Sequence, residues 1–138
     1  METGTPSYEA IAAVKAAAQF LMNQGMENVA SDEMVVFAPL LTGLQEIDGV
    51  RVVGPPTTDS RVPTVSFVVD GVHADDVARH LAKHKIAVWS GSSYAVGITD
   101  KLGLDAHGGV TRAGVVRYIT SHDVDRLLQS VRELAKTR

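Results

Sequence analysis

The chain has 138 residues, with 13 basic and 16 acidic side chains and no cysteine. A chain of this length fits one domain and can bury roughly two-thirds of the surface that it exposes when unfolded. The near balance of charge, without a run of like charges, gives no electrostatic footprint for nucleic acid or for an anionic membrane. The lack of cysteine excludes disulfides, thiolate metal sites and a cysteine nucleophile within this sequence.

The first residues place an acid and a proline where a signal peptide needs a basic start and an apolar core, and no apolar run approaches the length of a membrane span. We therefore expect a soluble, cytoplasmic protein. Thr5-Pro6 predicts the start of a helix, with Thr5 as the N-cap, and apolar residues then recur at helical spacing up to Gly25. A second helical region is predicted from Ser31 to Gly49, kinked or split by Pro39.

The pattern then changes to short β-prone runs. Val50 to Val53 and Thr64 to Val69 are each followed by glycine-containing turn residues, which predicts two strands. Residues 74–85 return to helical spacing, and Ile86 to Trp89 is short and apolar. A strand-helix-strand unit is the simplest interpretation of this part of the chain.

Residues 91–109 form the longest segment without clear periodicity, and loops of this kind often carry function. Gly108-Gly109 within it is predicted to be a turn, because it precedes a strand and not a helix. Val110 to Tyr118 predicts a strand. The chain closes with a predicted helix capped by Ser121, whose apolar residues fall on one face.

This order of elements predicts an α/β (α+β) fold, in which helices pack on a small mixed sheet. The apolar positions at the periodic spacings give the predicted core. It includes Ile11, Val14, Leu21, Phe67, Leu81, Val115, Leu127, Leu128 and Val131.

Two positions are candidates for binding anions. Gly4-Thr5 at the mouth of a helix can contact an anion through free N–H groups and a hydroxyl, although the residue types alone favour a simple N-cap. Arg112 lies in a stretch of small and apolar residues and needs a partner. That partner is either an internal carboxylate, which is the commoner case, or a substrate carboxylate held by the guanidinium fork.

His80 and His84 have the spacing of metal ligands on a helix, with His73, His107 and His122 as further candidates. Basic residues alternate with the pair, which favours a solvated helix face, so we expect no metal site and keep a metal-binding module built on His80 and His84 as the weakest alternative. Ser92, Ser93 and Tyr94 offer hydroxyls, but no histidine or aspartate stands in a triad arrangement with them, so we expect no serine catalysis.

Three segments, in order, resemble the class V aminotransferase family of pyridoxal-phosphate (PLP) enzymes, which includes cysteine desulfurases. Residues 2–6 (ETGTP) are similar to the family's E-x-G-T-P segment, and residues 61–72 to the strand that opens its small domain. Residues 110–120 (VTRAGVVRYIT), followed by 124–128, resemble its late arginine-containing signature. The likeness covers nearly the whole chain and indicates the C-terminal, small-domain portion of a cysteine-desulfurase-like member.

The resemblance implies roles for matched positions. Gly4 and Thr5 fall on the pair that contacts the PLP phosphate of the neighbouring subunit, and Arg112 falls on the arginine that binds the substrate's α-carboxylate. A homodimer or a large-domain partner is implied, together with an amino-acid substrate. Residues 1–30 would adjoin the large PLP domain and expose apolar surface without it, and residues 31–138 would form the small domain.

Two departures from the family pattern limit what this chain can do. Tyr94 stands where desulfurases carry the nucleophilic cysteine, so sulfur abstraction through that residue is excluded. The PLP-binding lysine of the family lies upstream of the E-x-G-T segment, and the lysines of this chain match no such position. We therefore expect that the chain alone is inactive, assign it no catalytic residue and expect no covalent PLP. The alternative is a non-catalytic binding or dimerisation module that retains the small-domain fold.

Overall fold

The structure is a computed structural model that describes residues 4–137. The chain divides into two compact units, with the boundary between Asp32 and Glu33. No helix within the described residues is both long enough and apolar enough to cross a membrane.

The first unit contains helix α1 (Tyr8–Gln24), which ends at Gly25, where φ is 76°. Its N-cap is Ser7, so the prediction of Thr5 as the cap is wrong. The physical reason is that the fixed φ of Pro6 suits an extended residue before the cap as well as a first helical turn. The Thr5 hydroxyl is therefore not used to start the helix.

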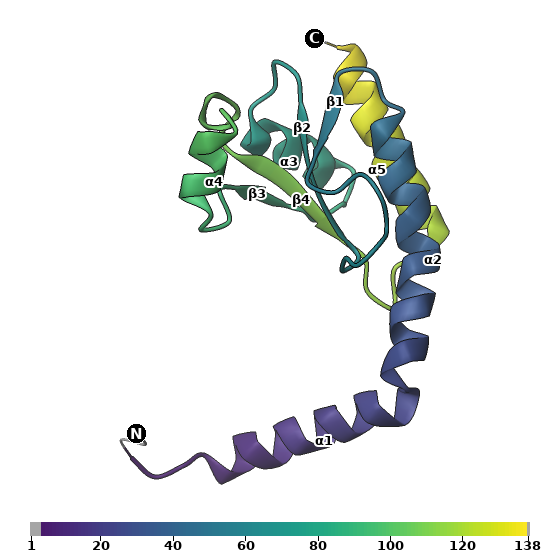
Figure 1. Cartoon of the computed structure of the whole chain (residues 1–138), viewed down its shortest axis with the longest axis vertical. Helices are drawn as coiled ribbons and strands as arrows, with labels where there is room; N and C mark the ends of the chain where they lie inside the picture. Colours follow the sequence, from purple (N-terminus) through teal and green to yellow (C-terminus); the bar gives the residue numbers. More distant parts are fainter. Residues whose placement is uncertain (1–3, 138) are drawn as a thin grey trace. The chain divides into compact units, whose positions relative to one another are not determined.

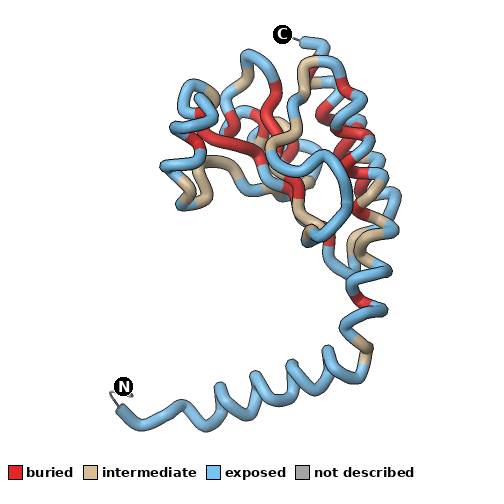
Figure 2. The backbone as a smooth tube through the Cα atoms, in the orientation of Figure 1, coloured by how far each residue is buried: buried red, intermediate tan, exposed pale blue. Residues whose placement is uncertain are grey.

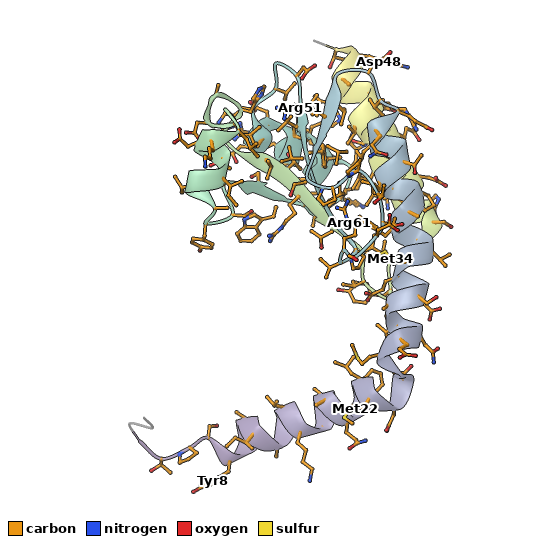
Figure 3. All side chains as sticks on the ribbon, viewed as in Figure 1. Tyr8, Met22, Met34, Asp48, Arg51 and Arg61 are labelled. Carbon is orange, nitrogen blue, oxygen red and sulfur yellow. The ribbon has the colours of Figure 1, made fainter. Side chains whose placement is uncertain are left out.

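No residue of α1 is buried, as Figure 2 shows along the whole helix. Ile11, Val14 and Leu21 are 58%, 68% and 43% exposed, so their assignment to the core is wrong. Helical spacing predicts an apolar face but does not say what covers it. Tyr8 and Met22, which are labelled in Figure 3, are exposed as well.

Helix α2 (Met26–Gln45) begins before the predicted Ser31 and runs through Pro39 without a break. A proline removes one helical hydrogen bond and leaves the carbonyl of the residue four positions earlier without its partner. Here that residue is Val35, whose side chain is 72% exposed, and Pro39 is exposed too. Water can therefore solvate the carbonyl, which allows the helix to continue.

The second unit is built on a four-stranded sheet in the order β1-β2-β4-β3. The strands are β1 (Val50–Val53), β2 (Thr64–Val69), β3 (Trp89–Gly91) and β4 (Val110–Gly114), and all neighbours pair antiparallel. Helix α3 (Ala74–Lys83) joins β2 to β3, and β4 lies between these two strands, which makes a split βαβ unit. The predicted α/β class, with helices packed on a small sheet, is confirmed, but the described strands form an antiparallel sheet and not the mixed sheet that was predicted.

Two strand boundaries differ from prediction. Helix α3 ends at Lys83, and the Ile86 N–H donates to the Leu81 carbonyl at 3.0 Å in the turn that follows the helix, so β3 begins only at Trp89. Strand β4 stops at Gly114 because Gly114 pairs with Thr64, the first residue of β2. Both limits are therefore set by what the strand can pair with and not by β propensity.

The stretch predicted to be irregular contains the short helix α4 (Val96–Lys101) and a 3-10 turn, η1 (Asp105–His107). The last helix, α5 (Ser121–Lys136), is confirmed, but its N-cap is Thr120 and not Ser121. The Asp123 N–H donates to the Thr120 hydroxyl oxygen at 3.3 Å, and the Thr120 N–H donates to the Asp123 carboxylate at 3.0 Å. This reciprocal capping box requires a carboxylate three residues after the cap, a spacing that Thr120 satisfies.

The main core lies between one face of the sheet and helices α2, α3 and α5 (Figure 1). Phe37, Phe67 and Leu81 are completely buried there. Six predicted core residues are confirmed, namely Phe67, Leu81, Val115, Leu127, Leu128 and Val131. On the other face of the sheet a smaller cluster joins Val68, Val110 and Leu104.

Gly43 of α2 tests how closely this core is packed. A methyl group at Gly43 would overlap the side chain of Leu128, which is buried and cannot swing into solvent. Alanine favours helix by about 1 kcal/mol over glycine, but overpacking costs typically 1 to 3 kcal/mol. We expect Gly43→Ala to lower the free energy of unfolding by roughly 1 to 2 kcal/mol in urea titrations.

The matched control is Thr42→Ala at the exposed neighbouring position, which should change stability by less than about 0.5 kcal/mol. A Gly43→Ala protein more stable than the wild type would show that α2 and α5 are not in close contact.

The capping box predicts a pH dependence. Hydrogen bonds from the Thr120 hydroxyl and backbone N–H, with Arg126 nearby, hold the pKa of Asp123 below its ordinary value. The stabilisation is thus fully present above the unfolded pKa of about 3.9 and is lost as the pH falls through the lower folded pKa. We expect Asp123→Asn to be less stable than the wild type at neutral pH, with the gap in melting temperature closing in acid. Asp125→Asn, an exposed change on the same helix, should show no such gap, and equal behaviour of the two variants would contradict the prediction.

Candidate functional site

The open face of the sheet is defined by the register of β4. Arg112 lies opposite Ser66 of β2 on one side and opposite Trp89 of β3 on the other. Because side chains alternate along a strand, these three residues project from the same face. Thr111 and Ala113 project from the other face, where the Thr111 hydroxyl lies 3.5 Å from the Ala74 carbonyl of α3. The core helices therefore leave Arg112 and Trp89 uncovered, and the Trp89 side chain is 58% exposed.

The side chain of Arg112 is exposed and makes no hydrogen bond or ion pair with any residue in the range 4–137. Arg61 is different. Its guanidinium donates to the carbonyls of Pro55 at 2.6 Å and Thr64 at 2.6 Å and lies 5.0 Å from the centre of the Phe37 ring. The internal ion pair considered for Arg112 is thus not seen in the described chain. Its guanidinium remains available for an external carboxylate.

The loop that follows β3 has an unusual backbone. Ser93 and Tyr94 adopt φ values of 50° and 63°, the left-handed region that non-glycine residues rarely occupy. Tyr94 is 99% exposed, whereas the Ser93 hydroxyl is buried and has no hydrogen-bond partner among the described residues. Conformations of this kind cost of order 1–3 kcal/mol each and concentrate at functional sites.

Gly4 and Thr5 belong to the first unit, and both are exposed. A side chain added at Gly4 would meet nothing within 4 Å, and Ser7 caps α1 without a side-chain hydrogen bond. The first N–H groups of α1 and the Thr5 hydroxyl therefore have no partner among residues 4–137. A phosphate could use both.

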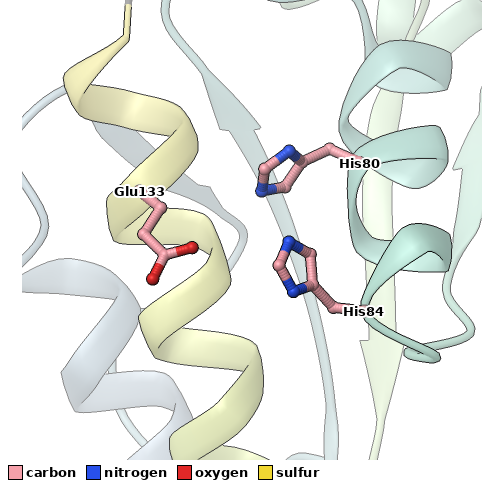
Figure 4. A group of neighbouring side chains, drawn as sticks. All are labelled: His80, His84 and Glu133. Atoms are coloured by element: carbon pink, nitrogen blue, oxygen red, sulfur yellow. The ribbon is translucent and has the colours of Figure 1, made fainter.

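His80 and His84 lie one turn apart on α3, as predicted, and their ring centres are 5.0 Å apart. Figure 4 shows that both rings point toward Glu133 of α5. The potential ligand atoms of the three residues lie within 4.8 Å of one another, and no other such group occurs within residues 4–137. The sequence identified the histidine pair but not Glu133, which reaches it only through the packing of α5 beside α3.

The other candidate histidines have different surroundings. His73 is the N-cap of α3, and its Nδ1 accepts a hydrogen bond from the Asp75 N–H at 3.3 Å. His107 closes the turn η1, and His122 lies in the first turn of α5. None of these three joins the pair on α3.

Comparison with known proteins identifies the family of this chain. The sequence model of the class V aminotransferase family matches residues 1–127 of this chain. A probable cysteine desulfurase of Mycobacterium leprae is 38% identical over 94% of this chain, and a cysteine desulfurase of Haloferax volcanii is 34% identical over 94%. In both cases the match spans only 30% of the relative's length.

Solved structures agree with the sequence comparison. An apo cysteine desulfurase from Thermococcus onnurineus superposes with a TM-score of 0.90 at 30% identity, over 99% of this chain and 33% of that one. A cysteine desulfurase from Escherichia coli gives 0.85 at 25% identity, again over 99% and 33%. The chain spans about a third of the length of the relatives it matches. The resemblance noted in the sequence is confirmed, and the chain belongs to the class V aminotransferase family.

Proposed function

We propose that this chain is the C-terminal portion of a PLP-dependent enzyme of the cysteine-desulfurase-like branch, acting on an amino acid. The observation that carries the proposal is the exposed and unpaired guanidinium of Arg112 on the open face of the sheet. PLP, when bound, supplies an electron sink for the substrate's α-carbon. The residues of this chain would bind and orient the substrate and the PLP phosphate. The remainder of the enzyme would supply the lysine that binds PLP covalently.

Arg112 would hold the α-carboxylate of the substrate. A guanidinium presents two parallel N–H groups that match a carboxylate, and fixing the substrate this way also fixes the direction of its α-carbon. Trp89 lies directly across the strand pair from Arg112. Its exposed indole would form an apolar wall beside the bound carboxylate.

Gly4 and Thr5 would contact the PLP phosphate of a neighbouring subunit. The free first turn of α1 supplies N–H donors, and Thr5 supplies a hydroxyl. The absence of a side chain at Gly4 allows a phosphate to approach the backbone closely. A homodimer follows from this proposal, because one subunit would complete the site of another.

The reaction would differ from desulfuration through a cysteine. This sequence contains no cysteine, and Tyr94 stands in the loop where the resemblance expects that nucleophile. The chain would therefore serve another conversion of an amino acid, with Tyr94 exposed in the loop that follows β3.

The apolar stripe of α1 supports the assignment of residues 1–30 to the neighbourhood of a large domain. Ile11, Val14, Ala18 and Leu21 follow the three-and-four spacing of a packing surface and are all exposed. The chain spans only about 30% of its relatives, which contain further chain that could cover this stripe. The alternative, a non-catalytic binding or dimerisation module, would instead pair the stripe with a second copy.

The proposal predicts that two arginine variants differ in their effect on the free energy of unfolding. Arg112→Gln should change the free energy of unfolding by less than about 0.5 kcal/mol, because the side chain is exposed and unpaired. Arg61→Gln, the matched control, should lose about 2 kcal/mol or more, because its charged hydrogen bonds to backbone carbonyls disappear. Urea titration measures both. A large loss for Arg112→Gln would assign that residue a structural role and remove the main support for substrate binding.

The lack of a matching lysine predicts that the purified chain forms no covalent adduct with PLP. Titration followed by absorbance, then borohydride trapping and mass spectrometry, should give absent or scattered labelling of lysines. Stoichiometric labelling of one lysine would contradict the proposal that the rest of the enzyme supplies the lysine that binds PLP.

Sedimentation distinguishes the proposal from the alternative. A stable homodimer without affinity for PLP or amino acids would favour the non-catalytic binding module.

A further inference from the structure

We propose that His80, His84 and Glu133 form a binding site for a divalent transition-metal ion, with zinc as the best match, that links α3 to α5. The three side chains bring two imidazoles and one carboxylate to one place on the helix-covered side of the sheet (Figure 4). Imidazole nitrogen selects zinc and its neighbours over magnesium and calcium, which prefer oxygen ligands. Two histidines and one carboxylate, with water in the remaining position, is a known zinc ligand set.

The three ligand atoms would have to move only slightly closer together to bind one ion. The three ligand atoms lie within 4.8 Å of one another, and donors around a tetrahedral zinc lie roughly 3.3 Å apart, given metal–ligand distances of about 2.0–2.1 Å. His84 and Glu133 are exposed and can change rotamer without disturbing the core. His80 is half-buried and provides the fixed part of the site.

The hydrogen bonds around the three residues are compatible with an ion. His80 Nε2 lies 3.1 Å from the Ser130 carbonyl, which accepts the imidazole N–H in the absence of metal. The Gln129 amide donates to Glu133 Oε1 at 3.1 Å, which holds the carboxylate and leaves its second oxygen available. An outer partner such as Gln129 orients a ligand in metal sites.

A second observation independent of the three ligands points to a bound group. Ser130 is only 3% exposed, and its hydroxyl has no hydrogen-bond partner among the described residues. Ser130 lines the same surface pocket as His84 and Glu133. An unsatisfied buried hydroxyl is unusual and calls for a partner such as an ordered water or an ion.

Arg126 lines the same pocket as His84 and Glu133. Its guanidinium donates to the His84 carbonyl at 2.6 Å and lies 3.7 Å from an oxygen of Asp123. Arg126 is thus held by partners of its own, and part of its charge is compensated. A metal ion at the histidines would add a second link between α3 and α5, about two turns further along α5 at Glu133.

The test is titration of the purified chain with zinc sulfate in competition with a chromophoric chelator. We expect one equivalent to bind, with the imidazole signals of His80 and His84 shifted in NMR spectra. The double variant His84→Ala/Glu133→Gln should bind at least about tenfold more weakly, since changes in the outer partners of a metal alone cost 10- to 100-fold.

The matched control is His122→Ala/Asp125→Asn. It removes the same two group types from exposed positions in the first turns of α5, outside the proposed site. This variant should bind zinc as the wild type does. Absence of stoichiometric binding, or equal weakening in both double variants, would overturn the proposal. Circular dichroism before titration verifies that each variant is folded, so that loss of binding reports on the ligands.

Discussion

The pairing of β4 with β2 is the interaction on which the rest of the second unit depends. Helices α2, α3 and α5 pack on one face of this strand pair, where Val65 and Phe67 of β2 and Ala113 of β4 are buried. Because side chains alternate along a strand, the same pairing turns Arg112 to the open face. A register slip by one residue would place the guanidinium beneath the helices, where burial without a partner is costly. The packing of the core therefore also fixes the exposure of Arg112.

The two units differ in how their helices are held. Helices α3 and α5 bury residues in the common core, whereas α1 buries none. A helix gains most of its stability in a protein from packing an apolar face, and isolated helices of modest length are marginal in water. The 17 residues of α1 therefore require an apolar partner that covers Ile11, Val14 and Leu21. This requirement, and not the sequence of α1 itself, connects the first unit to the proposed larger enzyme.

The sheet separates two kinds of chemistry. Its open face presents a guanidinium and an indole, which suit an organic anion. The helices on its other face present imidazoles and a carboxylate, which suit a metal ion. Helix α5 shows how one element serves both packing and binding, since it buries Leu127 and Leu128 and turns Glu133 outward. The periodicity that builds the core thus also determines which polar groups meet at the surface.

The sequence by itself determined the elements with strong periodicity, namely the last helix, the strands at Val50–Val53 and Thr64–Val69, and most of the sheet-facing core. It also indicated the family, because motifs keep their order along the chain. Local patterns report on periodicity, turns and caps, each of which involves residues close in sequence. They can miss an end by a residue or two, as at Ser7 and Thr120.

The tertiary structure alone decided what depends on residues far apart in the chain. The pairing of Trp89 with Arg112, the end of β4 at Gly114 and the approach of Glu133 to His80 are all of this kind. The exposure of α1 also depends on distant residues, because an apolar stripe has the same sequence whether or not a partner covers it. Each of these outcomes is set by the packing of one element against another, which the local sequence does not encode.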